Sequence, residues 1–210
     1  MYIRRDQADA LLETSMSAIR QRIETNLAFI KELLAGDDWS FVIKTQALLE
    51  ACITEAILIK LGDERIRRTV ETMPLAGEEV SKLQLTKDLN LMDTSQRRFV
   101  KKIASLRNKL AHRVEYVNFA FPDYIASLDR DAKKDWQESI VWFAEAPGSR
   151  AQWRETSIIQ PRSAVLMGAF VLAAILAVDE NQEKLLRAID SASEETTTDL
   201  LRLLDSASGA

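Results

Sequence analysis

The most regular hydrophobic pattern of the chain lies near mid-sequence. Apolar residues recur there every three or four positions, at Phe99, Ile103, Leu106, Leu110, Val114 and Val117. This period is typical of an amphipathic helix with one buried stripe. The residues Asp93, Thr94 and Ser95 stand where the N-cap of such a helix is expected. The pattern therefore predicts a helix that begins near residue 93 and buries this stripe through residue 117.

Several polar residues of this predicted helix lie away from the buried stripe. Asn108 and His112 project from nearly the opposite side, one turn apart, and Arg107 lies near the edge of the stripe. His112 is the only histidine of the chain. The opposite face also carries Ala104 and Ala111, which are small enough to let another backbone come close. The pattern predicts a polar group beside a face suited to close packing.

The helical period extends over most of the chain. The further helices predicted from it cover about residues 7–34, 40–61, 64–71, 78–89, 131–144, 163–178 (with a continuation to about 188) and 196–204. The flanks 118–122 and 146–149 are predicted to be loops. Gly (6) and Pro (4) are scarce, and residues that favour helices are abundant. The chain is therefore predicted to be all-α.

Length and composition predict a single helical domain over residues 1–210. Its 210 residues, 47% of them hydrophobic, are enough for one substantial core. Residues 118–162 hold three of the four Trp and three of the four Pro, which indicates an aromatic-rich helical insertion or cap packed on the bundle. These aromatic side chains either form a small core of the insertion or stack on nucleic-acid bases.

The apolar segments predict a cytoplasmic protein without a membrane-spanning helix. The longest apolar run, from Ala164 to Val178, has 15 residues, whereas a membrane span needs about 20. We therefore expect a buried core helix that packs closely at Gly168. Cys52 is the only cysteine, so it cannot form an intramolecular disulfide. A buried thiol in a reducing cytoplasm is the simplest interpretation, and a catalytic thiol has only His112 to work with.

The central helix is the most basic local region of an acidic chain. The net charge of −4 gives no global basic field, so any contact with nucleic acid must use a local patch. Seven cations fall within residues 97–113: Arg97, Arg98, Lys101, Lys102, Arg107, Lys109 and Arg113. They either form a solvated helix face or bind RNA phosphates. In the second case Lys101, Lys102, Lys109 and Arg113 are the expected phosphate contacts.

Two carboxylates interrupt the apolar surroundings of the predicted helix 40–61. Burying an unpaired carboxylate is costly, so Glu50 and Glu55 each need solvent or a partner. Either both reach solvent at the edge of the helix, or one of them meets Arg107 or His112.

The chemistry open to the central helix is limited by its residues. A zinc site is excluded by the shortage of His and Cys at ligand spacing, and the chain has neither a nucleophile elbow nor a glycine-rich phosphate loop. No metal or other cofactor is expected. What remains is acid–base chemistry by His112, with Arg107 stabilising negative charge and Asn108 orienting either group. Cleavage of RNA by its own 2′-hydroxyl needs these functions. The structural alternative is that His112 lines a helix interface and Arg107 pairs with a Glu.

The spacing of these three residues resembles a known motif. Arg107 and Asn108, followed by three residues and His112 late in a helix, resemble the motif of the HEPN superfamily (higher eukaryotes and prokaryotes nucleotide-binding domains). The amino-acid sequence of residues 106–112, together with that of residues 85–91, also resembles the mannitol-repressor-like branch of bacterial proteins. The resemblance covers mainly residues 39–117. It implies an up-and-down helical bundle that dimerises, with two motif helices facing each other in a shared cleft.

The resemblance implies two functions. Many HEPN domains are metal-independent endoribonucleases of toxin–antitoxin, phage-defence and CRISPR systems, and Arg107, Asn108 and His112 match their motif. The leading expectation is such a ribonuclease, acting as a homodimer on RNA and associated with an antitoxin or regulatory protein partner. The alternative, implied by the repressor-like branch, is a non-catalytic transcriptional-regulatory or protein-interaction module. A stable helical scaffold with a structural His112 is the third interpretation.

Overall fold

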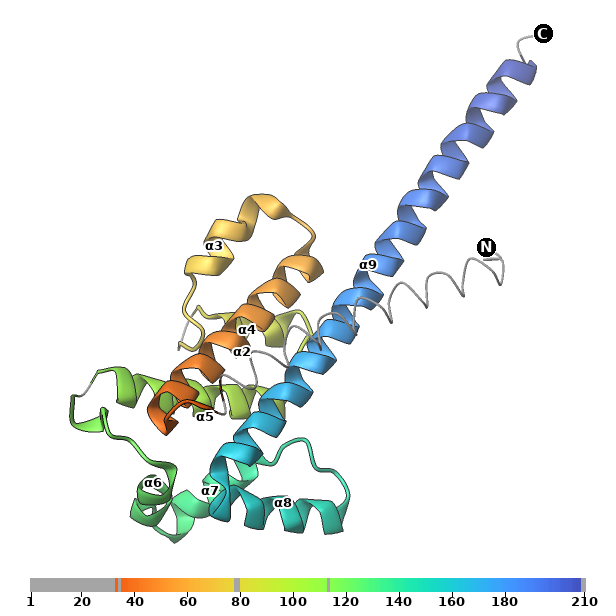
Figure 1. Ribbon diagram of the computed structural model, residues 1–210. Coiled ribbons are helices and arrows are strands. Elements are labelled where there is room, and N and C mark those ends of the chain that lie inside the picture. Colours follow the sequence, from red (N-terminus) through yellow and green to blue (C-terminus); the bar gives the residue numbers. More distant parts are fainter. Residues whose placement is uncertain (1–32, 34, 78–79, 113, 209–210) are drawn as a thin grey trace.

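The computed structural model describes residues 33, 35–77, 80–112 and 114–208, and in this part every regular element is a helix. The elements are α2 (Asp38–Leu61), η1 (Glu64–Ile66), α3 (Arg67–Thr72), α4 (Lys82–Asp88), α5 (Thr94–Ala111), η2 (Val114–Tyr116), α6 (Phe121–Ser127), α7 (Arg130–Ile140), α8 (Pro147–Ile159) and α9 (Pro161–Ser208) (Figure 1). The prediction of an all-α chain is confirmed. The predicted helix at 7–34 lies almost wholly outside the described residues, and the up-and-down bundle stays a prediction.

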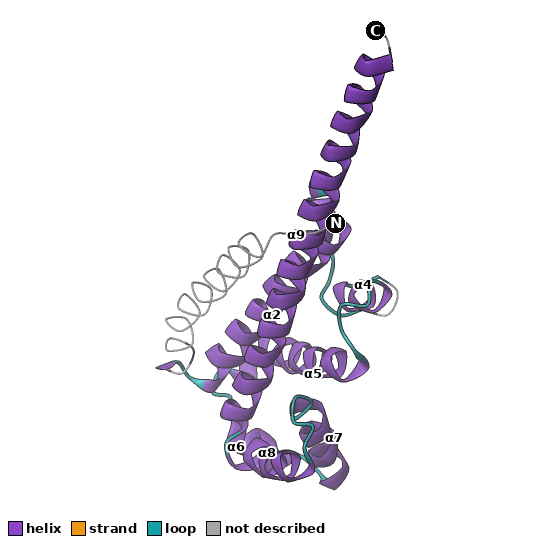
Figure 2. Ribbon diagram, turned by 90° about the vertical axis from the view of Figure 1, so that its right-hand side faces the viewer, coloured by secondary structure: helices purple, strands orange, loops and turns teal. Residues whose placement is uncertain are grey.

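The helices are arranged around α2 and α9. These two helices pack side by side, α5 packs against α2, and α7 and α8 pack near the beginning of α9. Figures 1 and 2 show the second half of α9 projecting well beyond the other helices. The prediction of separate helices at 163–178 and 196–204 is therefore wrong, because one helix of 48 residues covers both.

The boundaries of α2 follow from its caps. The Asp37 carboxylate accepts a hydrogen bond of 2.7 Å from the Ser40 backbone N–H. At the other end Gly62 has φ +68°, the left-handed conformation that glycine adopts most readily, and its N–H donates to the Leu58 carbonyl at 2.8 Å. Both caps are formed by residues close to the helix ends in the sequence. The predicted helix at 40–61 is confirmed.

Two helices begin where the sequence predicts loops. Pro122 lies in the first turn of α6, and Pro147 is the first residue of α8. Proline at the first helical positions loses no intrahelical hydrogen bond and has a helical φ already. Both prolines therefore stand in the first turns of helices, and the loop predictions over 118–122 and 146–149 were wrong in part.

α9 buries one side of its apolar segment. Gly168 lies so close to α5 that a β-carbon added there would meet the Phe99 ring at 3.0 Å and the Trp142 indole at 3.2 Å. The predicted close packing at this glycine is confirmed. The other side of the helix exposes Met167, Phe170 and Val178. Within the described part, the stretch Pro161–Lys184 is long and apolar enough to cross a membrane, but core helices of soluble proteins have the same length and composition.

Aromatic side chains connect residues 118–162 to the main core. Trp136 on α7 is fully buried, and its ring contacts those of Phe121 and Tyr124 at centroid distances of 6.1 and 5.5 Å. Phe121 in turn packs against Phe41 of α2 at 6.0 Å. One chain of ring contacts thus runs from α7 to α2. The division of the chain into a bundle and an insertion stays a prediction.

Candidate functional site

The motif lies at the C-terminal end of α5, whose beginning is fixed by a capping box. Asp93 accepts a hydrogen bond from the Gln96 backbone N–H, and the Gln96 side chain accepts one from the Asp93 N–H, both at 2.8 Å. The predicted cap at residues 93–95 is therefore confirmed. From this start, the helix carries Arg107 and Asn108 in its last two turns.

The end of α5 differs from the prediction. The helix stops at Ala111, and His112 follows as its C-cap with φ −102° and ψ 1°. The Leu110 carbonyl, which would accept a bond from residue 114 in a longer helix, accepts one from the Trp39 indole N–H at 3.4 Å. The buried stripe consequently ends at Leu110, and Val117 is 61% exposed. The predicted extension of the helix through residue 117 is wrong.

The three motif residues lie on the sides of α5 that the pattern predicts. Asn108 and His112 are exposed, and Arg107 is half-buried at the edge of the buried stripe. An Arg107 Nη1–H donates to the Asn108 side-chain oxygen at 3.2 Å, so these two residues act as one polar unit. The Arg107 Nε–H is buried without a hydrogen-bond partner among the described residues.

His112 is brought near this unit but is not bonded to it. Its side chain forms no hydrogen bond or ion pair with any residue that the structure describes. The structure thus joins Arg107 to Asn108 and leaves the imidazole open to solvent. A bound RNA or a second protein chain would have to orient it.

The basic residues around the motif fall into two groups. Arg98 and Lys102 form ion pairs with Asp135 of α7, and Arg98 also reaches Glu138 at 3.4 Å. Of the predicted phosphate contacts, Lys102 is therefore already neutralised by a carboxylate. Lys101 and Lys109 are exposed, with no ion pair to any described residue, and Arg113 lies outside the described part.

The two carboxylates of α2 have partners elsewhere. Glu50 pairs at 2.7 Å with Lys82, which is only 2% exposed, and Glu55 pairs at 2.7 Å with Arg67. A buried ammonium requires a carboxylate close by, which accounts for Glu50. The hypothesis that one of these carboxylates meets Arg107 or His112 is wrong.

The small face predicted for close packing is only partly open on this chain. Ala111 is exposed, but Ala104 is only 5% exposed and belongs to the hydrophobic core. The side of α5 that remains open carries Lys101, Ser105 and Asn108, with His112 beyond its end. A homodimer through the motif helix remains a prediction, and it would have to use this polar side.

Comparison of the chain with protein-family models, with curated proteins and with solved structures found no match. Among the residues that the structure describes, no group of three or more His, Cys, Asp or Glu side chains is placed to hold a metal ion. Cys52, which was predicted to be buried, is half-buried. The geometry at the end of α5 is thus the basis for assigning a function.

The ion pairs that join α5 to α7 make stability depend on pH. Hydrogen bonds from Arg98 and then from Lys102 hold the pKa of the Asp135 carboxyl below its usual value of 3.8. A lowered pKa stabilises the fold above the ordinary pKa, and this contribution is lost as the pH falls through the folded value. Because the pair is nearly half exposed, Asp135→Asn should lower the free energy of unfolding at pH 7 by only about 0.5–1 kcal/mol. Urea unfolding at pH 7 and at pH 3 measures this, and an equal loss at both would contradict it.

Proposed function

We propose that this protein is a metal-independent endoribonuclease of a bacterial toxin or defence type that acts as a homodimer. One observation carries the proposal: a guanidinium bonded to an amide at the end of α5, within a turn of an exposed imidazole. Lys101 and Lys109 on the same helix add positive charge that no described carboxylate neutralises. A guanidinium binds phosphate oxygens in two-pronged fashion, and an imidazole exchanges protons near neutral pH.

The reaction that fits these groups is attack of a ribose 2′-hydroxyl on its own phosphate. The bond from the 2′-oxygen to phosphorus forms and the bond from phosphorus to the 5′-oxygen breaks, leaving a 2′,3′-cyclic phosphate and a 5′-hydroxyl. His112 takes the proton from the 2′-hydroxyl or gives one to the leaving 5′-oxygen. Arg107 holds the non-bridging phosphate oxygens while their charge develops, and Asn108 fixes the guanidinium.

A homodimer supplies what one chain lacks. The reaction moves two protons, one at each side of the phosphorus, and the chain has one histidine. Two copies of α5 facing each other across a two-fold axis would place two imidazoles at one phosphate. The proposal therefore includes a shared site between two protomers, a cytoplasmic location where RNA is present, and an antitoxin partner that restrains the activity.

A second function is favoured by one feature of the same site. His112 has no described residue that orients its ring, as a catalytic imidazole usually has. A transcriptional-regulatory or protein-interaction module, in which Arg107 and Asn108 contact a protein partner, needs no such orientation. The two functions differ in what the intact protein does to a cell.

Expression in a bacterium distinguishes these functions. The ribonuclease is expected to arrest growth when the wild-type chain is induced without a partner, whereas His112→Ala should allow normal growth at the same protein level. Total RNA from both cultures, and total RNA incubated with each purified protein in excess chelator, should be fragmented by the wild type alone. Normal growth and intact RNA with both proteins would favour the regulatory module.

A further inference from the structure

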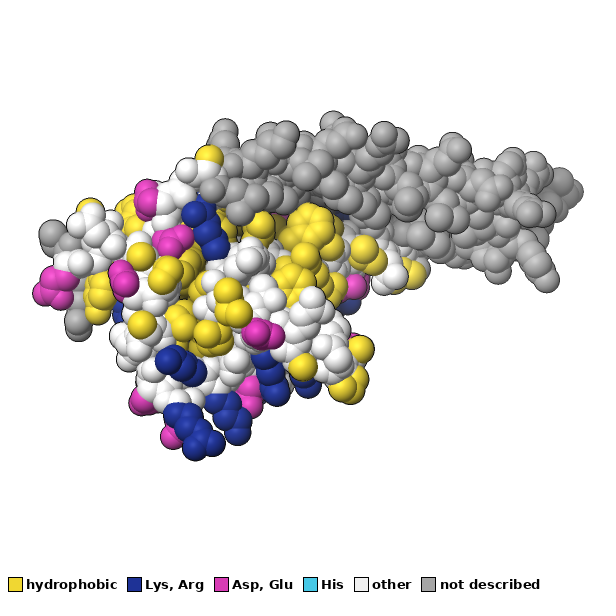
Figure 3. All heavy atoms as spheres, turned by 60° about the horizontal axis from the view of Figure 1, so that its bottom comes forward, with side chains coloured by type: hydrophobic (Ala, Val, Ile, Leu, Met, Phe, Trp, Pro, Cys, Tyr) yellow, Lys and Arg dark blue, Asp and Glu magenta, His cyan; other side chains and the backbone are white. Residues whose placement is uncertain are grey.

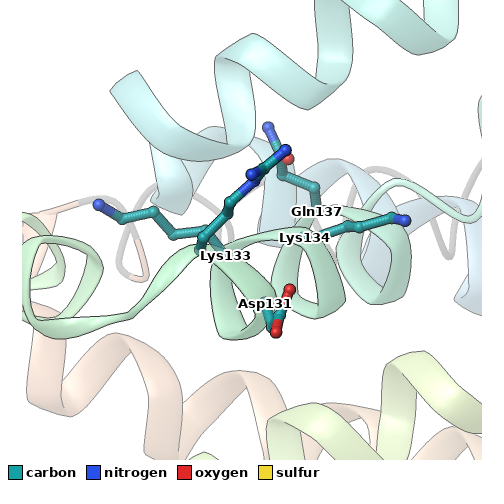
Figure 4. Close-up of a pocket in the computed structure, with 5 residues that line it drawn as sticks. Asp131, Lys133, Lys134 and Gln137 are labelled. Carbon is teal, nitrogen blue, oxygen red and sulfur yellow. The ribbon is translucent and has the colours of Figure 1, made fainter.

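A second basic surface lies on α7, away from the motif helix. Arg130, Lys133 and Lys134 occupy its first two turns and line, with Asp131 and Gln137, an open hollow of about 720 Å³. Figure 4 shows Lys133 and Gln137 directed to one side of α7 and Asp131 to the other. The cations are thus collected on the solvent side of the helix.

Among the described residues, no carboxylate forms an ion pair with these three cations. The carboxylates of α7 that face α5, Asp135 and Glu138, are occupied by Arg98, and Asp135 also by Lys102. α7 therefore pairs Asp135 and Glu138 with α5, while its three cations have no ion-pair partner among the described residues.

Two further exposed arginines lie on α8, which packs beside α7. The Gln137 side-chain N–H donates to the Arg154 carbonyl at 3.1 Å, which holds α8 beside α7. Arg150 and Arg154 are exposed, and their side chains form no ion pair with a described residue. Figure 3 looks onto this end of the molecule, where Lys and Arg side chains lie along the lower edge with some Asp and Glu side chains among them. We name the five cations Arg130, Lys133, Lys134, Arg150 and Arg154 the α7–α8 surface.

We propose that the α7–α8 surface binds the sugar–phosphate backbone of an RNA strand. Lys and Arg bind phosphate oxygens as point charges or in two-pronged fashion, and residues three and four apart on a helix are neighbours that meet one strand. The cations spread over two helices and do not converge on one buried point, which fits a row of phosphates better than a single anion. The choice of RNA rests on the proposed function, whereas the surface is distinct from the motif.

A pair of matched triple variants tests this surface. The first variant carries Arg130→Gln, Lys133→Gln and Lys134→Gln. The control carries Lys44→Gln, Arg68→Gln and Lys87→Gln, which remove the same charge from exposed positions on α2, α3 and α4. Both are made in the full chain with His112→Ala, and their thermal unfolding is compared to check the fold. Binding of a fluorescein-labelled single-stranded RNA is followed by anisotropy between roughly 50 and 200 mM salt.

The expected result is specific to the first triple variant. Its affinity for RNA at low salt should fall about tenfold or more, and the slope of log K against log salt should become shallower by about 2, since each phosphate contact contributes about 0.7. The control should keep the affinity and slope of the parent. Equal losses in both triples, no RNA binding by the parent, or competition by polyglutamate as strong as that by unlabelled RNA would each overturn the proposal.

The outcome is separable from that of the ribonuclease proposal. If the first triple loses RNA binding while the wild-type chain cleaves no RNA, the surface stands and the ribonuclease fails. If the wild-type chain cleaves RNA while the first triple binds as the control does, the ribonuclease stands and the surface is overturned.

Discussion

Replacing His112 by alanine is expected to lower the rate of RNA cleavage by about a hundredfold or more, because a positioned general acid or base contributes about that factor. The same change should leave the free energy of unfolding almost unaltered, since the exposed imidazole bonds to no described residue. Cleavage of a defined RNA and urea unfolding, measured on the same preparation, give both quantities. Ser105→Ala, on the same exposed side of α5, is the matched control and should change neither.

The stability measurement separates the catalytic role from a structural one. If His112 were a satisfied structural residue, its removal would cost about 1 kcal/mol or more. Such a loss together with unchanged cleavage would contradict the account. Arg107→Lys adds a second check. Lysine keeps the positive charge, but it cannot bind a phosphate with two parallel hydrogen bonds, and it would not reproduce the hydrogen bond from the guanidinium to the Asn108 side-chain oxygen. It should lower cleavage while the protein stays folded.

Trp136→Ala is expected to lower the free energy of unfolding by about 3–5 kcal/mol, the range for removing a buried large aromatic side chain. The Trp136 side chain is fully buried between Phe121 and Tyr124, and its indole N–H donates to the Ser157 carbonyl at 2.9 Å. Both the packing and this link from α7 to α8 would be lost. Denaturant unfolding followed by circular dichroism measures the effect.

Two features of that experiment make it specific. Trp136→Phe removes the hydrogen bond but keeps most of the ring, so it should cost much less than the alanine variant. Because ring contacts run from Trp136 through Phe121 to Phe41 of α2, the wild-type chain should unfold in one cooperative transition. An early, separate transition of residues 118–162 in Trp136→Ala would contradict this and indicate an insertion with its own core.

The parts of the fold that sequence predicts well depend on neighbours along the chain. The capping box at Asp93 and the helix end at Gly62 each depend on residues only a few positions apart. The apolar period of α5 places Asn108 and His112 on the exposed side. The same period cannot show that Ala104 would be buried, because the period does not record which helices become neighbours. The predicted small face is therefore open only at Ala111, and the dimer stays a prediction.

Contacts between residues far apart in the chain could not be predicted from the sequence. Glu183 of α9 pairs with Lys60, and Arg187 donates to the Lys60 carbonyl at 3.0 Å. These bonds dock α9 on the end of α2, about 120 residues away in the chain. The bond from Trp39 that accompanies the early end of α5 also joins distant residues, 71 positions apart in the chain. None of these contacts can be recognised from the residues next to it in the sequence.

In the candidate site, too, local features could be predicted from the sequence and long-range contacts could not. The spacing of Arg107, Asn108 and His112 is local and was found from the sequence. The cations of α7 at positions 130, 133 and 134 are also visible there, at helical spacing on one side. That α5 would occupy the carboxylates of α7 and that α8 would extend the basic surface became evident only from the packing.

The measurement that tests the central claim most directly is the chemistry of the cleaved ends. Wild-type protein and His112→Ala are incubated with a defined RNA oligonucleotide in excess chelator, and the products are analysed by mass spectrometry. The account predicts fragments with 2′,3′-cyclic phosphate and 5′-hydroxyl ends from the wild type alone. Intact RNA with the wild type, or the same fragments at the same rate with His112→Ala, would contradict it.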